Sequence, residues 1–305
     1  MNKVDYRKTA IIICTKDRLQ DLKEYLDSIF IQTVLPNELI IVDSSKNNKT
    51  KSFINQIEYE VPFKIQYVHT VPCLTLQRNI GIKTTEAEII HFMDDDVILE
   101  RDYLEEINRI YSDDKKNDIG GVFGLLTNIQ NSSFFAKFIR RLFMLSRSDG
   151  FGNMQPSGFQ AFQFITNRST VAETEVFCGI CSYRKEVFNN FQFDENMKGY
   201  GLMEDIDFSY RVSRKYKLIY TPYAKVFHKS SPVSRINSRQ FCFMKTYNHY
   251  YFFMKNIEKT SKTWFCFWWS TIGVFIESIV MAIKFFSFNP IYGFAKGIFK
   301  IVLQK

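Results

Sequence analysis

The stretch EIIHFMDDDVIL, residues 88–99, places three carboxylates directly after an apolar run. Asp94, Asp95 and Asp96 repel one another when all three are charged, and apolar residues resume at once after them. A cluster of this kind beside a buried strand favours a role in binding over a role in stability. A solvent-exposed acidic turn is the alternative interpretation, and an isolated DDD leaves it open.

The first hundred residues alternate between apolar runs and segments with helical spacing. The helical segments comprise one with apolar residues at Leu19, Leu22, Leu26, Ile29 and Phe30 and two more at residues 50–57 and 73–83. The apolar runs, which are typical of buried strands, lie at residues 10–14, 38–42, 64–68 and 88–93. Strands that alternate with helices of about ten residues predict an α/β fold with a parallel sheet and crossover helices.

Polar residues follow these strands where such sheets bind ligands, outside the carboxyl ends. They are Thr15, Asp43 and the three aspartates. Neither GxxxxGK[ST] nor GxGxxG occurs, which excludes two common nucleotide-binding loops. A nucleotide diphosphate can instead be held through Mg²⁺ or Mn²⁺, which prefer oxygen ligands. Asp94 and Asp96 are two residues apart and can point to the same side, one toward the sugar of a nucleotide and one toward the metal.

A second acidic cluster opens a predicted helix at Glu204, Asp205 and Asp207. Acids at a helix N-terminus satisfy free N–H groups and the helix dipole, so capping is the simpler interpretation. Three acids exceed what a cap requires, however, and a short basic strand at residues 217–220 leads on to His228. A histidine that returns toward an acidic loop fits a metal ligand or a diphosphate contact.

The C-terminal third is basic and rich in aromatic residues. From residue 206 onward, 16 Lys and Arg stand against 3 acids, which predicts an anionic partner, either a membrane surface or nucleic acid. Residues 264–283 are long enough to span a bilayer, but Glu277 lies among them. We therefore expect helices that lie in the membrane interface, with a true span and soluble helical packing or dimerisation as alternatives. Residues 134–145 form a basic amphipathic pattern typical of either a membrane contact or a packed surface helix.

Six cysteines are scattered along the chain, and only Cys178 and Cys181 form a CxxC pair. A single pair with no second CxxC and no nearby histidine is a poor zinc or disulfide framework. The pattern predicts reduced thiols in a cytosolic protein.

These motifs, in this order, resemble family 2 glycosyltransferases with the GT-A fold, from about residue 9 to residue 232. They read IIICTKDR, LIIVDSS, QRNIGI, FMDDDV, VFCGICSYRKEVF, FDE, GYGLMEDIDFSYRV and AKVFH. The resemblance implies a single mixed, mainly parallel sheet flanked by helices. It implies a nucleotide-sugar-binding half (1–97) and an acceptor-binding and catalytic half (98–232). The remaining residues, 233–305, are the basic, aromatic-rich tail, which we expect to be helical and to associate with membrane. The first motif departs from the family pattern, because Asp17 precedes Arg18 where Asn is common.

The resemblance assigns a role to each matching residue. Asp205 corresponds to the catalytic base. The residues that correspond to nucleotide-sugar contacts are Thr15, Asp43, Arg78, Asp94 and Asp95. The metal ligands, for Mn²⁺ or Mg²⁺, correspond to Asp96 and His228. The acceptor-side residues are Glu204, Gly179 and Tyr200.

The implied function is an inverting, metal-dependent transfer of a sugar from a nucleotide-diphosphate donor to a glycan, expected to be lipid-linked. Capsule or O-antigen synthesis at the cytoplasmic face of the cell membrane is the expected setting, with the tail on anionic lipid and no nucleic-acid partner. One alternative is a nucleotidyltransferase, although its usual Gly-rich phosphate loop is not visible. Another is a protein that binds nucleic acid or an anionic surface, which leaves the acids unexplained. The sequence leaves the sugar, the nucleotide and the oligomeric state open.

Overall fold

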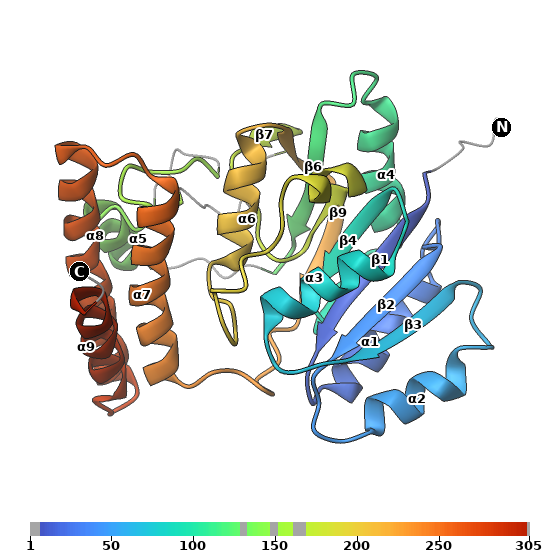
Figure 1. Ribbon diagram of the computed structural model, residues 1–305, viewed down its shortest axis with the longest axis horizontal. Helices are drawn as coiled ribbons and strands as arrows, with labels where there is room; N and C mark the ends of the chain where they lie inside the picture. The colour runs from blue at the N-terminus through green and yellow to red at the C-terminus, as the bar shows by residue number, and fades with distance from the viewer. Residues whose placement is uncertain (1–6, 129–132, 147–151, 161–168, 304–305) are drawn as a thin grey trace.

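The computed structural model describes residues 7–128, 133–146, 152–160 and 169–303. Figure 1 shows a twisted sheet with helices on both faces and, at one end of the molecule, a group of helices from the C-terminal part of the chain. The sheet has nine strands within these described ranges. Their order is β3-β2-β1-β4-β8-β6-β9-β5, and β7 pairs with β9.

The N-terminal part of the sheet is parallel, as the alternating pattern predicts. The predicted strands and helices are confirmed to within one residue at each end. The strands are β1 (Thr9–Thr15), β2 (Glu38–Asp43), β3 (Lys64–His69) and β4 (Ile89–Met93). The helices between them are α1 (Leu19–Phe30), α2 (Lys49–Ile57) and α3 (Leu74–Thr84). All three pairings among these strands are parallel, so their carboxyl ends meet at one edge.

The second part of the sheet is mixed. Strand β8 runs antiparallel to both β4 and β6 and so joins the two parts, whereas β6 and β9 are parallel. The strands are β5 (Val97–Leu99), β6 (Ile119–Leu126), β7 (Ala172–Thr174), β8 (Cys181–Arg184) and β9 (Lys217–His228). The helices are α4 (Tyr103–Asp113), the 3₁₀ helix η1 (Lys185–Asn189) and α6 (Glu204–Ser213).

Strand β9 is longer than the sequence pattern predicts. The expected strand at residues 217–220 continues to His228 and has 12 residues. Pro222 lacks an N–H group and therefore argues against a continuous strand. The β6–β9 pairing shifts register opposite this proline, between Phe123 and Leu125, and resumes at Lys225. The irregularity accommodates the proline, and the strand carries His228 to the edge where β5 pairs with it.

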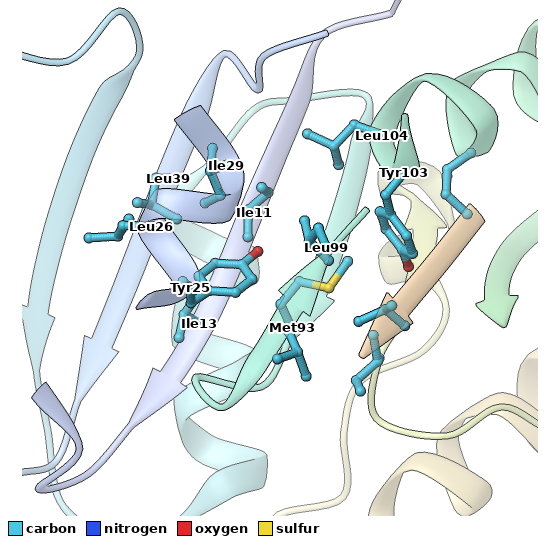
Figure 2. Close-up of a cluster of buried hydrophobic side chains, with 14 of the residues drawn as sticks. Ile11, Ile13, Tyr25, Leu26, Ile29, Leu39, Met93, Leu99, Tyr103 and Leu104 are labelled. Atoms are coloured by element: carbon cyan, nitrogen blue, oxygen red, sulfur yellow. The ribbon is translucent and has the colours of Figure 1, made fainter. Parts of the chain in front are cut away.

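Apolar side chains fill both faces of the sheet. Figure 2 shows the face covered by α1 and α4, where Ile11 and Ile13 of β1 meet Tyr25 of α1 and Met93 of β4. On the other face, aromatic side chains form the core, and Phe208 of α6 stacks there on Phe188. Each cluster draws residues from before and after position 97, so the predicted halves share one sheet and one core. Their division into donor and acceptor functions stays a prediction.

The chain after residue 233 is helical, as predicted. It forms α7 (Ser238–Asn256), α8 (Ser261–Lys284) and α9 (Asn289–Val302). Helix α5 (Phe134–Leu142) lies with this group, and it ends three residues earlier than the expected helix at 134–145 because Phe143 and Leu145 turn into a cluster against α8. Among the described helices, α8 alone is long and apolar enough to cross a membrane.

Candidate active site

Strand pairing at one side of the sheet brings His228 to the acidic loop. Strand β4 ends at Met93, the three aspartates form the turn, and β5 begins at Val97. Val97 is the register partner of His228 in the antiparallel β5–β9 ladder. The site therefore combines two segments that lie 132 residues apart in the sequence.

Asp94, Asp96 and His228 form a cluster with the donors of a metal site. One ligand atom from each lies within 4.8 Å of the others. The Nε2 atom of His228 is 3.0 Å from Asp96 Oδ1 and 4.0 Å from Asp94 Oδ2. Two carboxylate oxygens and one imidazole nitrogen suit a divalent ion of the Mn²⁺ type, so these residues fit the cofactor that the sequence predicts. The resemblance assigns Asp96 and His228 to the metal. In the structure, Asp94 lies close enough to both to be a third ligand.

Half-buried His228 and buried Asp96 shift each other's pKa. The hydrogen bond with Asp96 is the largest influence on His228 and raises its pKa above the ordinary value. Burial raises the pKa of Asp96, but His228 and Arg18 outweigh it and hold the pKa below the usual range. A metal ion at this cluster would need His228 without its second proton, so binding there would release protons at low pH.

Asp95, the middle acid, is engaged by other side chains. Thr15 Oγ1 donates a 2.6 Å hydrogen bond to Asp95 Oδ2, and Arg18 Nη1 donates one of 2.9 Å to Oδ1. Burial raises the pKa of Asp95 to about 6, despite the opposing effect of Arg18. Thr15 and Asp95, two of the five predicted nucleotide-sugar contacts, are thus hydrogen-bonded to each other at the acidic loop.

Two arginines that the sequence analysis did not assign to the site lie against the acids. Arg18 Nη1 is 3.6 Å from Asp96 Oδ2, and Arg235 Nη2 is 3.4 Å from the same oxygen. Arg18 also donates two hydrogen bonds to the carbonyl of Val233, which ties the loop after β1 to the loop after β9. Arg18 belongs to the first motif, IIICTKDR, so its place in the sequence indicates weakly that it lies near the site. No motif includes Arg235, so the sequence does not indicate that it lies there.

Asp43 lies one strand away from the acidic loop. It is the register partner of Thr15 in the β1–β2 ladder and is fully buried. Its Oδ1 accepts from the Ser45 backbone at 2.8 Å, and its Oδ2 accepts from the Tyr67 hydroxyl at 2.9 Å. It belongs to the same sheet edge as the acids without touching them.

Arg78 lies beneath the site, in a buried ion pair. Its Nη1 is 3.0 Å from Glu204 Oε2, and its Nη2 donates to the Gly179 carbonyl at 3.4 Å. Its guanidinium also lies 5.1 Å from the centre of the Phe193 ring. Burial would lower the pKa of Arg78, but Glu204 outweighs it and raises the pKa. The sequence predicts Arg78 near the nucleotide, and in the structure its polar contacts are with two predicted acceptor-side residues.

Gly179 lies close to the end of the Arg78 side chain. A Cβ at this position would lie 2.9 Å from Arg78 Nη2 and 3.8 Å from Asp94 Oδ1. A larger residue would therefore displace the Arg78 guanidinium, which is paired with Glu204. The Gly179 loop links the Arg78–Glu204 pair to the metal-site candidates.

The loop before α6 positions Asp205 and Tyr200. Gly199, Gly201 and Met203 all have positive φ, and Met203 immediately precedes the helix. Asp205 is half-buried at the second position of α6, and burial raises its pKa above the ordinary value. Burial also raises the pKa of Tyr200, on which charges of the acidic loop and of both site arginines act. The structure thus brings the second acidic cluster to the first.

Comparison with known proteins gives a family and a fold. Residues 10–191 match the model of glycosyl transferase family 2. Poly(ribitol-phosphate) beta-N-acetylglucosaminyltransferase TarP of Staphylococcus aureus (strain N315) is 28% identical over 123 residues, which are 39% of this chain and 37% of TarP. The uncharacterized glycosyltransferase YwdF of Bacillus subtilis (strain 168) is 28% identical over 100 residues, 33% of this chain and 37% of YwdF. The matched stretches thus span little more than a third of these relatives.

Two solved structures share the fold. GalNAc-T7, crystallised with UDP, GalNAc and Mn²⁺, superposes with a TM-score of 0.57 at 14% identity, over 82% of this chain and 50% of GalNAc-T7. S. aureus TarS 1-349 gives 0.54 at 13% identity, over 90% of this chain and 74% of that one. The predicted GT-A fold and transferase class are confirmed. Because the family model matches more than half of the chain, the protein belongs to glycosyl transferase family 2.

Proposed function

We propose that this glycosyltransferase transfers a sugar from a nucleotide-diphosphate donor to a glycan acceptor in one displacement, with inversion at the anomeric carbon. The observation that carries the proposal is that the Gly179 loop, next to Asp94 and to Arg78, connects two acidic clusters from distant parts of the chain. One is the Asp94–Asp96–His228 group, and the other begins α6 with Glu204 and Asp205. A donor held at the first cluster would have its reacting carbon within reach of an acceptor bound near the second.

The donor would lie at the carboxyl ends of β1, β2 and β4. Thr15 and Asp43 are neighbours at this edge and would line the nucleotide side. Asp94, Asp96 and His228 would hold Mn²⁺ or Mg²⁺, which when bound would neutralise charge on the departing nucleoside diphosphate. Arg18 and Arg235 lie beside these acids and supply positive charge where the diphosphate would sit.

Asp205 would accept the proton of the acceptor hydroxyl. Its carboxyl group is half-buried, and burial raises its pKa, which makes it a better base than an exposed aspartate. Glu204, held by Arg78, would support the loop on the acceptor side. Attack from the face opposite the leaving group needs no covalent intermediate, so the product anomer is inverted.

The acceptor proposed here is a cell-surface polymer, reached at the cytoplasmic face of the membrane and lipid-linked. The name of TarP, an enzyme that acts on poly(ribitol-phosphate), supports a polymer acceptor. The excess of Lys and Arg after residue 206 supports a nearby anionic membrane. Attachment through residues 233–305 would keep the enzyme where such acceptors are assembled.

A transfer assay tests the proposal. Purified protein is offered a panel of UDP-, dTDP- and GDP-sugars with a lipid-linked or polymer acceptor, in Mn²⁺ or in EDTA, and the product anomer is determined by NMR. We expect one donor to react only with metal, with inversion, and Asp205→Asn to lose at least about a hundredfold in rate. Asp27→Asn, an exposed change on α1, is the matched control. Retention of configuration, or full transfer by Asp205→Asn, would overturn the mechanism.

A further inference from the structure

The outward side of α8 carries no polar residue over most of its length. The structure describes this helix throughout, and between Lys262 and Lys284 every exposed position is apolar. These positions are Phe265, Trp268, Ile272, Phe275, Val280 and Ile283. A continuous stripe of large apolar side chains in water is unfavourable, so this side of α8 needs a covering.

Helix α5 extends this stripe although it lies about 130 residues earlier in the chain. None of the residues of α5, all of which are described, is buried, and Phe134 is 86% exposed. The helix is held against α8 by a 2.7 Å hydrogen bond from Trp269 Nε1 to the Leu142 carbonyl. The Phe143 and Trp269 rings stack with their centres 5.1 Å apart. Figure 1 shows α5 within the group of C-terminal helices.

Helix α9 and the turn before it border the stripe on its other side. Phe275 of α8 meets Phe294 of α9, with ring centres 5.1 Å apart. In the turn, Phe286 is 98% exposed, and Phe288 is also exposed. We name the combined surface the apolar face. It consists of Phe134, Phe135, Phe138 and Leu142, the six α8 residues above, Phe285, Phe286 and Phe288, and Phe299, Val302 and Leu303.

The inward side of α8 shows why this helix stays packed. Glu277 forms an ion pair with Lys245 of α7 and lies 3.8 Å from Arg140 of α5. Ser270 and Ser278 are buried between the helices. A lone span would expose Glu277 and both serines to lipid and separate these pairs, which is costly. Only the apolar face is therefore available to a bilayer.

The charge around the apolar face distinguishes lipid from a second copy of the chain. The helices that carry the apolar face, α5, α8 and α9, contain seven Lys and Arg against one acid, Glu277, which pairs inward with Lys245. Two copies placed face to face would bring these positive surfaces together. An anionic bilayer attracts them while it covers the apolar side chains.

We infer that α5, α8 and α9 form one monotopic attachment surface, whose apolar face lies in the interface of an anionic bilayer without crossing it. The inference rests on the membrane attachment proposed above and adds α5 to the attached region. It does not depend on whether the protein transfers a sugar. With α8 lying along the membrane, both of its ends stay on the same side.

Vesicle sedimentation of the full chain tests the surface. The vesicles contain phosphatidylcholine alone or an equimolar mixture with phosphatidylglycerol. Two triple variants, Phe134→Ser/Phe135→Ser/Phe138→Ser and Phe265→Ser/Ile272→Ser/Ile283→Ser, are expected to lower the partition coefficient on the mixed vesicles about tenfold or more. The control, Ile31→Ser/Tyr59→Ser/Val71→Ser, removes three exposed apolar residues far from this face and should bind as the wild type does. Circular dichroism checks that each variant folds.

Orientation is read from one cysteine introduced at either end of α8, with the labelling of the six native cysteines in the wild type subtracted. Lys262→Cys and Lys284→Cys should both react with a membrane-impermeant maleimide added outside intact vesicles. Labelling at only one end would show a span and overturn the inference.

The inference would be overturned if the protein bound neither vesicle and formed a dimer in sedimentation equilibrium that the α8 variant dissociates. The apolar face would then be covered by a second copy of the chain. Equal binding by the α5 variant and the wild type would remove α5 from the surface. Vesicle binding by a protein that transfers no sugar would contradict the proposed function and leave the attachment surface standing. Sugar transfer to a soluble acceptor by a protein that does not bind vesicles would contradict the attachment surface and leave the proposed sugar transfer standing.

Discussion

At the scale of single residues, the raised pKa of Asp205 sets a pH dependence. Burial is its largest cause, and Arg78 opposes it. A base must be deprotonated to accept a proton, so the rate should fall as the pH drops through this pKa. Because the shift is upward, the fall should begin above the pH expected for an ordinary aspartate, whose pKa is about 3.9. The acid limb of kcat/KM against pH measures it.

Asp95 is another carboxyl group of the site with a raised pKa, about 6 because of burial. Asp95→Asn therefore serves as the comparison and should keep the acid limb. If the acid limb of the pH profile disappears in Asp95→Asn and persists in Asp205→Asn, the titrating group is Asp95, which would contradict the assignment to Asp205.

The Arg78–Glu204 pair should matter more to stability than any exposed pair. Both side chains are almost fully buried, 3.0 Å apart. Arg78→Met leaves a buried carboxylate without its partner, which typically costs about 3–5 kcal/mol of unfolding free energy. Arg109→Met breaks the exposed pairing with Glu106 and should cost about 0–1 kcal/mol. Urea unfolding measures both.

The double variant Arg78→Met/Glu204→Gln separates the pair from its surroundings. It should recover a large part of the stability lost in Arg78→Met, because no charge is left buried. Equal losses in the single and double variants would mean that Arg78 stabilises the fold through its other contacts, with Gly179 and Phe193, and not through the charge of Glu204.

At the scale of elements, α7 holds α6 in place. Asp207 of α6 is fully buried and accepts from Asn256 at 2.8 Å and from Lys255 at 3.0 Å, both at the end of α7. Lys255 also reaches Asp194, 2.6 Å away, in the loop before α6. The helix that begins with Glu204 and Asp205 is thus fixed from the side of the attachment helices.

Asp194 makes this link pH-dependent. Burial raises its pKa, but Lys255, Tyr251 and the Asn196 backbone outweigh it and lower the pKa from 3.8 to about 2. A lowered pKa contributes stability that is complete above the unfolded-state pKa and is lost as the pH falls through the folded value. Asp194→Asn should therefore melt below the wild type at neutral pH, and the difference should shrink between pH 4 and pH 2. A difference independent of pH would contradict this role.

The elements differ in how far the sequence could predict them. Strands β1 to β4 were predictable because each apolar run is bounded by polar residues and separated by a helical pattern. The length of β9 was not, because its extension past Pro222 depends on a register shift against β6. Strand β8 has four residues, and its pairing with β4 joins positions almost a hundred residues apart. No local pattern determines such a contact.

At the scale of the whole molecule, the site was predictable only where a local pattern of residues marks it. Acids at a strand end marked Asp94 and Asp96, and acids at the start of a predicted helix marked Asp205. A histidine that returns toward an acidic loop marked His228. The sequence could not show Arg235 at Asp96, because that contact depends on where the loop after β9 lies. Nor could it show that Arg78 pairs with Glu204, 126 residues later. Both contacts exist only once the two parts of the sheet are joined.

The central claim is that Asp94, Asp96 and His228 hold a metal-bound nucleotide-sugar, and thermal shift with a donor panel tests it most directly. A donor at a hundredfold excess over its Kd stabilises the fold by about 2.7 kcal/mol, a shift easily seen in the melting temperature. We predict that one donor shifts the midpoint with Mn²⁺ and not with EDTA. Asp94→Asn and Asp96→Ala should abolish the shift, and Asp27→Asn should keep it. An equal shift in EDTA, or a full shift in Asp96→Ala, would contradict the account.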